Sequence, residues 1–389
     1  MGNVPHLRFP EFTEEWKETK LGKIAEITKG SGISKDRLSE YGSPCILYGE
    51  LYTKYKSEII NEVYSRTELD SSLLVKSKAN DVIIPCSGET AIDISTARCV
   101  PFNNILLGGD LNIIRLKNND GGFFAYQLNG TRKKDIARVA QGVSVVHLYG
   151  ENLKHIRVYH PAIEEQKKIT RLLSLIDKRI ATQNKIIEDL KKLKSAIIEI
   201  EYSPKDSYHS HIGGAIVQIS KRNKDNHLCN VLSVSNRQGF IKQSEQFEDR
   251  NVASDDTSNY KIVEKNDFAY NPARINVGSI ARLTKFETGI VSPMYICFRT
   301  KDCLLPEYLE LFFESRNFFY HIQKRLEGSV RLCLSYEELC NIPIVIPSIE
   351  KQKQVDLHLS KLAQKIDLEM KILQFVQQQK TYLLHQMFI

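Results

Sequence analysis

A nine-residue phrase occurs twice in this chain, and the segment after each copy has the pattern of a long helix. PAIEEQKKI begins at Pro161 and PSIEKQKQV begins at Pro347, 186 residues later. After each phrase, apolar residues recur at spacings that alternate between four and three, which is the a/d seam of a coiled coil. We therefore expect two long helices, each of which covers the apolar seam of the other.

The two seams match position by position, including their polar interruptions. Gln183 falls on Glu369, and Lys194 falls on Lys380. If the helices pack antiparallel, one self-consistent register places Lys380 beside Ile169 and brings both lysines to the ends, where an ammonium reaches water. The predicted seam residues are Leu173, Ile176, Ile180, Gln183, Ile187, Leu190, Leu359, Leu362, Ile366, Glu369, Leu373 and Val376.

The duplication extends upstream of the phrase, with similar ends and divergent middles. The same offset aligns Asn80-Asp81 with Asn266-Asp267, whereas NIIRL (112–116) fits YICFR (295–299) only after a shift of three residues. Each half therefore consists of a globular domain followed by a helical spacer. The predicted domain ranges are 1–161, 162–202, 203–347 and 348–389.

Both predicted globular domains mix strand and helix signals. Residues 81–90, 104–116 and 155–161 are short apolar runs ended by Gly, Pro or polar residues, which is typical of strands. Residues 123–139 and 306–326 have helical periodicity. We predict an α+β fold with two similar globular domains, joined by two long helices that pack as an antiparallel coiled coil with pseudo-two-fold symmetry.

Composition permits a polyanionic partner and disfavours several other classes of protein. The 389 residues carry a net charge of +7, which permits nucleic-acid binding without requiring it. The eight cysteines show neither C-x-x-C nor zinc-ligand spacing, and they favour reduced thiols in the cytoplasm. No apolar run reaches the roughly eighteen residues of a membrane span. No phosphate-binding loop is present, and NPAR (271–274) departs from the Asn-Pro-Pro-aromatic motif of amino-methyltransferases. We expect no metal site and no catalytic residues.

Polar, aromatic and basic residues remain on predicted loops of both domains. Arg reads guanine, Asn and Gln read adenine, and Lys contacts phosphate, so such loops suit DNA recognition. Ordinary loop surface or a structural cap is the alternative for each residue. The candidate DNA-binding residues are Tyr52, Lys54, Tyr55, Ser87, Glu89, Thr90, Ser144, His147, Arg237, Gln238, Asn271, Arg274, Asn276 and Arg331.

Two divergent globular domains, each followed by a long helix that opens with Pro-x-Ile-Glu-x-Gln, resemble the specificity subunit of type I restriction–modification systems. The resemblance covers nearly the whole chain. It also rests on the N-terminal PHLRFPEFTEEWKETKLGKIAEITKG, on DFAYNPARINVGSIARL, on VSPMY (291–295) and on G-S-V-R-x-x-L (328–334).

This resemblance implies a sequence-specific DNA-recognition subunit without catalytic activity of its own. Each globular domain would be a target recognition domain that reads one half of a split, asymmetric sequence, and the helices would set the gap. The implied partners are double-stranded DNA, two adenine methyltransferase (M) subunits and two motor–nuclease (R) subunits. The assembly would use S-adenosylmethionine, with ATP and magnesium for cleavage, and none of these would be held by this chain. The alternative is a coiled-coil scaffold or adaptor whose terminal domains bind proteins, which predicts no salt-dependent affinity for DNA.

Overall fold

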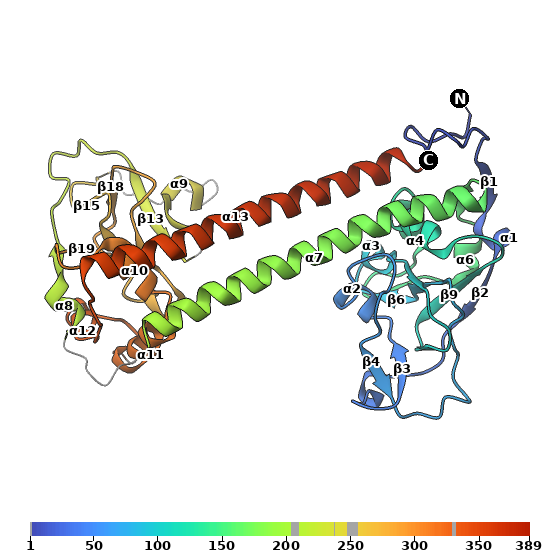
Figure 1. Cartoon of the computed structure of the whole chain (residues 1–389), viewed down its shortest axis with the longest axis horizontal. Helices are drawn as coiled ribbons and strands as arrows, with labels where there is room; N and C mark the ends of the chain where they lie inside the picture. The colour runs from blue at the N-terminus through green and yellow to red at the C-terminus, as the bar shows by residue number, and fades with distance from the viewer. Residues whose placement is uncertain (1, 204–209, 237, 247–255, 329–331) are drawn as a thin grey trace. The chain divides into compact units, whose positions relative to one another are not determined.

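The chain divides into two compact units that each contain part of both long helices. The computed structural model describes residues 2–203, 210–236, 238–246, 256–328 and 332–389. Unit 1 comprises Met1–Lys185 and Met370–Ile389, and unit 2 comprises Ile186–Glu369. Helix α7 (Ile163–Glu201) and helix α13 (Ile349–Gln386) are the two long helices, green and red in Figure 1. Unit 1 holds the start of α7 and the end of α13, and unit 2 holds the reverse, so the helices run in opposite directions.

The globular part of unit 1 contains small sheets with short helices packed against them. An antiparallel four-stranded sheet has the order β2-β9-β5-β7, and a three-stranded sheet has the order β4-β3-β8. Two strand pairs, β1-β11 and β10-β6, complete it. The elements are β1 (Lys17–Lys20), α1 (Leu21–Ile24), β2 (Ala25–Lys29), β3 (Ser43–Ile46), α2 (Glu50–Thr53), β4 (Ser65–Thr67), β5 (Asp81–Pro85), β6 (Ser87–Gly88), α3 (Ala91–Ile94), β7 (Arg98–Val100), β8 (Leu106–Leu107), β9 (Leu111–Leu116), α4 (Gly121–Asn129), α5 (Lys133–Val139), β10 (Val146–His147), α6 (Gly150–Lys154) and β11 (Arg157–His160).

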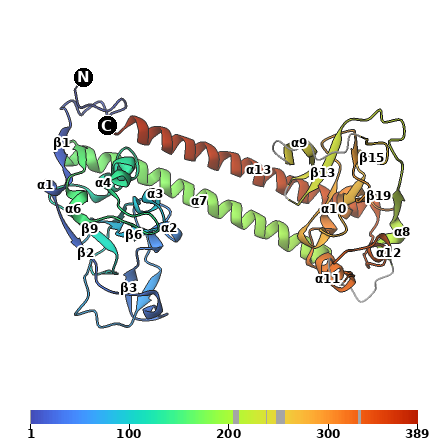
Figure 2. The ribbon, with the colours of Figure 1, turned by 180° about the vertical axis from the view of Figure 1, so that it is seen from behind.

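Aromatic side chains form the core of unit 1. Trp16 packs edge-on against Phe123 of α4 with ring centroids 5.5 Å apart, and Phe388, beyond the end of α13, lies 5.1 Å from Phe123. Leu173 of α7 belongs to the same buried cluster. Figure 2 shows α4 against the first part of α7. Residues from both ends of the chain and from both long helices therefore share one core.

Unit 2 contains two four-stranded sheets. Their orders are β12-β19-β16-β17 and β14-β13-β18-β15. Tyr202, which follows α7, donates a buried hydrogen bond of 2.6 Å to the carbonyl of Tyr308, and both rings share a core with Val355 and Leu359 of α13. The elements are α8 (Ile212–Ala215), β12 (Ile216–Ile219), β13 (Val231–Ser235), β14 (Gly239–Lys242), α9 (Gln243–Gln246), β15 (Lys261–Glu264), β16 (Phe268–Tyr270), β17 (Ile280–Arg282), β18 (Thr288–Val291), β19 (Ile296–Thr300), α10 (Pro306–Phe312), α11 (Arg316–Arg325) and α12 (Tyr336–Cys340).

The predicted α+β class and the two long antiparallel helices are confirmed. Each of the two stretches with helical periodicity forms a pair of helices, α4 with α5 and α10 with α11. Gly130 ends α4, where its N–H bonds to the carbonyl of Tyr126, and Ser315 caps α11 through its hydroxyl, which accepts from the N–H of Phe318. Periodicity continued across both breaks because the helices on either side bury their apolar faces in the same core.

Candidate nucleic-acid interface

The predicted residues of the segment that contains α2 separate into an exposed and a buried group. Tyr52 is exposed, and Lys54 forms an ion pair of 2.7 Å with Glu50 while part of its side chain remains accessible. Tyr55 is only 4% exposed and stacks on Tyr64. Tyr55 is therefore wrong as a DNA contact, because its ring belongs to the core; an aromatic residue in a polar loop gives no sign of which way it points.

Strand pairing brings several predicted residues of unit 1 together. Ser87 of β6 pairs directly with His147 of β10, and Ser144 is exposed on the hairpin that precedes β10. Glu89 is exposed beside Thr90, whose hydroxyl caps α3 by accepting from the N–H of Asp93 at 3.1 Å. The pKa of Tyr52 is raised by burial and by neighbouring groups that include Glu89. Ser87, Glu89, Thr90, Ser144 and His147 thus lie on or next to the β6–β10 strand pair.

The hairpin between Gln141 and His147 is closed at its base and apolar at its tip. Each of these two residues donates its N–H to the carbonyl of the other, at 2.9 and 2.7 Å. Gly142 has φ +119, a conformation that side chains rarely adopt. Val143 is 97% exposed and Val145 is also exposed. Neither valine is among the candidate DNA-binding residues, although the order Gly142-Val143-Ser144-Val145 places both valines just after the turn glycine.

In unit 2, the predicted residues Asn271, Arg274 and Asn276 lie on one tight turn. Asn271 bonds through its main chain to Ser279 and Arg274, and its side-chain oxygen accepts from the N–H of Ala273 at 3.1 Å. Arg274 and Asn276 are exposed. The side chain of Asn271 therefore shapes the turn, and the side chains of Arg274 and Asn276 are displayed by it.

The turn of unit 2 borders a cleft that also involves the β13–β14 hairpin. The cleft has a volume of about 430 Å³ and is lined by Asn236, Gly239, Ile275 and Gly278, among others. Gln238 is exposed on the same hairpin. Arg237 and Arg331, also predicted to bind DNA, lie outside the described residues.

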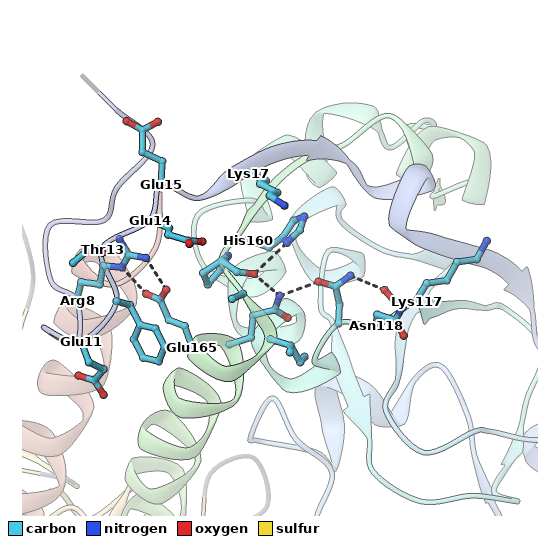
Figure 3. Close-up of a pocket in the computed structure, with 16 residues that line it drawn as sticks. Arg8, Glu11, Thr13, Glu14, Glu15, Lys17, Lys117, Asn118, His160 and Glu165 are labelled. Carbon is cyan, nitrogen blue, oxygen red and sulfur yellow. Dashed lines mark hydrogen bonds and ion pairs between the residues drawn. The ribbon is translucent and has the colours of Figure 1, made fainter.

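The glutamine of the repeated phrase is the best-defined feature of both helix starts. Gln166 is almost fully buried; its side-chain N–H groups donate to the carbonyl of Pro161 and to Asn119 Oδ1, both at 2.9 Å. Its oxygen accepts from the N–H of Asp120 at 2.9 Å. The amide thus joins the loop before α4 to the turn before α7. Figure 3 shows the adjoining cleft of about 510 Å³, where Arg8 forms an ion pair with Glu165.

Gln352 makes the equivalent bonds in unit 2. Its side chain donates to the carbonyls of Pro347 and Cys303 at 2.9 and 3.0 Å, and its oxygen accepts from the N–H of Leu305 at 2.8 Å. The repeated phrase therefore encodes a buried clamp between each long helix and its globular part. The prolines lie just before the helices, where their carbonyls serve as acceptors, and α7 begins at Ile163.

A second repeated feature links the two central strands of a four-stranded sheet in each unit. Asp81 receives two hydrogen bonds from Arg115, at 2.9 and 2.8 Å, and Asp267 receives two from Arg299, at 2.5 and 3.0 Å. Both carboxylates are buried. The asparagine before each has a positive φ, which Asn tolerates better than most residues. These bidentate pairs account for the Asn-Asp repeat.

The predicted seam residues are all buried or half-buried, and of the two seam lysines Lys380 departs from the prediction. Lys380 does not reach water: its side chain is 15% exposed and bonds to Glu58 at 2.6 Å and to Asp177 at 2.7 Å. Asp177 lies about 12 Å along α7 from Ile169, too far for Lys380 to reach from a position opposite Ile169. The predicted register is therefore wrong in unit 1. In unit 2, Lys194 bonds to Glu314 at 2.6 Å.

Two other kinds of feature are absent from the described residues. Among them, no group of three or more His, Cys, Asp or Glu side chains could hold a metal ion. Within the same part of the chain, no helix combines the length and the apolarity needed to span a membrane.

Residues 13–192 match the family model of the type I restriction modification DNA specificity domain. The MjaVIII specificity subunit of a type I restriction enzyme from Methanocaldococcus jannaschii is 24% identical over 198 residues, which cover 50% of this chain and 42% of the relative. The putative MjaX specificity subunit from the same organism is 25% identical over 211 residues, 51% of this chain and 48% of the relative. The match thus spans about half the length of these curated relatives.

Solved structures share the fold over nearly the whole chain. The S subunit of a type I restriction–modification system from M. genitalium has a TM-score of 0.63 at 16% identity, with 99% of both chains covered. A chain from a structure of an assembled type I R-M system has a TM-score of 0.55 at 12% identity, with 95% of this chain and 96% of that chain covered. Together with the family match, these findings confirm the resemblance to type I specificity subunits.

Proposed function

We propose that this chain, whose residues 13–192 match the family model of the type I restriction modification DNA specificity domain, is the DNA-recognition subunit of a restriction–modification complex. Each globular part reads one half of a bipartite, asymmetric DNA sequence. Partner subunits then methylate adenine at that site or cleave the DNA. The chain itself selects the site and performs no chemistry.

The observation that carries this proposal is the contrast between repeated clamps and unlike exposed loops. Both units keep the buried glutamine and the aspartate–arginine pair, whereas their displayed side chains differ. Unit 1 presents Ser144 and His147 beside exposed valines, and unit 2 presents Arg274 and Asn276 on a tight turn. Arg and Asn bind the major-groove edges of guanine and adenine, and apolar tips contact thymine methyl groups. Two unlike readers on one repeated frame suit an asymmetric target.

The long helices suit the role of a spacer. Helix α7 has 39 residues and is therefore about 58 Å long. Successive major-groove faces of DNA are about 34 Å apart, so a helix of this length can connect readers of two half-sites.

Partner subunits complete the proposed function. Two M subunits would bring S-adenosylmethionine to the target adenine, which leaves the base stack to react. Two R subunits would bring ATP and magnesium for cleavage. The complex would act in the cytoplasm, where the DNA of a restricting cell lies.

The proposal is tested by exchanging one globular part and mapping methylated adenines. The full-length chain is assembled with M subunits, and residues 203–347 are replaced by the corresponding domain of another family member. We expect one half-site to change while the other half-site and the spacer persist, and the same exchange of residues 1–161 serves as the matched control on the other half. A change in both half-sites would refute modular reading.

A salt titration separates DNA recognition from the scaffold alternative. If each neutralised phosphate releases a counterion, log K falls linearly with log salt, with a slope of about −0.9 per contact. A protein scaffold would show no specific DNA affinity and no such slope, and that outcome would overturn the proposal.

A further inference from the structure

Lys194 and Lys380 are repeated charges on seams that are otherwise mostly apolar. They occupy equivalent positions of the duplication, and a lysine costs more to bury there than a leucine would. A charge that is only tolerated would extend into water. Neither lysine does so in its own unit, because each ammonium binds a carboxylate of the globular part.

In unit 1, the ammonium of Lys380 lies within a polar cluster. Its Nζ bonds to Glu58 Oε2 at 2.6 Å and to Asp177 Oδ1 at 2.7 Å, and Asp177 Oδ2 accepts from the hydroxyl of Tyr126 at 2.6 Å. Burial lowers the pKa of Lys380, but the two carboxylates raise it by more, and the net shift is upward. The cluster therefore ties α13 to α7, to α4 and to the loop of Glu58 as a charged ion pair.

In unit 2, Lys194 makes the corresponding contact from α7. Its Nζ bonds to Glu314 Oε2 at 2.6 Å, between α10 and α11, and the two side chains are 22% and 46% exposed. Nearby, the carboxylate of Glu199 accepts from the N–H of Arg316 at 2.9 Å. The end of α7 is thus attached to the start of α11 at two points.

The acids that meet these lysines are not themselves repeated. Glu58 lies between α2 and β4, whereas Glu314 lies between α10 and α11. A lysine is present at the same seam position in both halves. The glutamates that bind the two lysines come from different elements of the two globular parts. This pattern indicates that the position requires an ammonium that can be bonded from the globular part.

The seam lysines attach the helix segments that the repeated glutamines do not contact. Gln166 clamps the start of α7 in unit 1, and Gln352 clamps the start of α13 in unit 2. Each unit contains one further helix segment, the end of α13 or the end of α7, and that segment carries the lysine. Glutamine and lysine together thus attach both helices of a unit to one globular part.

We propose that Lys194 and Lys380 are positioning residues that fix each globular part on its two helix segments, and that they thereby set the spacer length between the half-sites. This inference rests on the proposed function. Each globular part shares an apolar core with its helix segments. Each lysine adds a directional ion pair between the globular part and the second helix segment, which restricts how the globular part is oriented on the helices.

The test measures methylation across DNA targets whose half-sites are separated by spacers of different lengths. The full-length chain, assembled with M subunits, is compared with Lys194→Met, Glu314→Gln, Lys380→Met and the control Lys361→Met, which removes an exposed charge of α13. We expect unchanged half-sites, but the preference for the native spacer over spacers one base pair longer or shorter should fall by up to about fivefold for the exposed Lys194 pair. Lys361→Met should keep the native preference.

A charge swap makes the result specific to the ion pair. Lys194→Glu combined with Glu314→Lys should restore the spacer preference that either change alone lowers, and Lys380→Arg should retain it. Lys380→Met leaves buried carboxylates without their charge partner, so this variant is compared only if circular dichroism shows that it is folded. If it is not folded, the Lys194 variants alone decide the question. Unchanged spacer preference in folded Lys194→Met would overturn the inference. A wild-type assembly that methylates no bipartite site would overturn the proposed function instead.

Discussion

Replacing Gln166 by Leu should destabilise unit 1 strongly, although the change is close to volume-conserving. The variant loses the bonds to Pro161, Asn119 and Asp120, each of 2.9 Å. It leaves the carbonyl of Pro161 and the N–H of Asp120 without their side-chain partner in largely buried surroundings. Each unsatisfied buried group costs about 1–3 kcal/mol, so we expect the free energy of unfolding to fall by about 3 kcal/mol.

Trp16 provides a local signal for this measurement. It is the only tryptophan of the chain, is buried in the core of unit 1, and donates its indole N–H to Glu165, the neighbour of Gln166. Urea unfolding is followed by its fluorescence. With an m-value of about 3 kcal/mol per molar urea, a loss of about 3 kcal/mol moves the midpoint down by about 1 M.

The matched control is Lys167→Ala, which changes the exposed residue next to Gln166 and should move the unfolding free energy by no more than about 0.5 kcal/mol. A Gln166→Leu midpoint within the range of this control would refute the clamp. It would mean that the repeated glutamine contributes nothing beyond a helix start. Gln352→Leu should show a comparable loss in unit 2, followed by circular dichroism.

Three further predictions concern burial and charge. Maleimide should label the exposed thiols of Cys229 and Cys303 in the native chain, as detected by mass spectrometry. It should label four further thiols only after unfolding, because burial raises the pKa of each to about 11 or 12: Cys45, Cys86, Cys99 and Cys297. Burial lowers the pKa of His160 in the folded chain below 6.5. The contribution of the neutral His160 to stability is therefore present above pH 6.5 and is lost as the pH falls through the lowered pKa of the folded state. His160→Gln should reduce the drop in the urea midpoint of the Trp16 signal between pH 7.5 and pH 5. Phe388→Ala should cost about 3–5 kcal/mol in the same assay, because this ring packs on Trp16 and Phe123, and a loss below about 1 kcal/mol would contradict that packing.

The features that could be predicted from the sequence are those with a local period. The a/d spacing predicted both long helices because a seam every three to four residues has few other uses. The same spacing could not predict the register, since several registers bury similar layers. In unit 1 the choice depends on Lys380 and Asp177, whose contact also involves Glu58, a residue of the globular part.

The candidate site was predicted only at the level of segments. The loops around Ser87 and His147 come together because β6 pairs with β10, and no local pattern of two-residue strands reveals that pairing. Tyr55 and Tyr52 differ by three positions in one polar segment, yet one ring is buried and the other exposed. The direction of such side chains depends on distant packing, such as the stacking of Tyr55 on Tyr64.

The duplication separates residues that build the frame from residues free to vary. Gln166 and Gln352 bond mainly to backbone groups, and backbone groups persist when side chains change, so the clamp tolerates divergence around it. Lys194 and Lys380 bond to carboxylates, which each globular part must supply anew. A globular part transferred between family members would therefore carry its backbone acceptors automatically but would need its own acid opposite the seam lysine. An exchanged domain that lacks this acid should read its half-site correctly and still lose spacer preference, and restoring a single carboxylate should recover it.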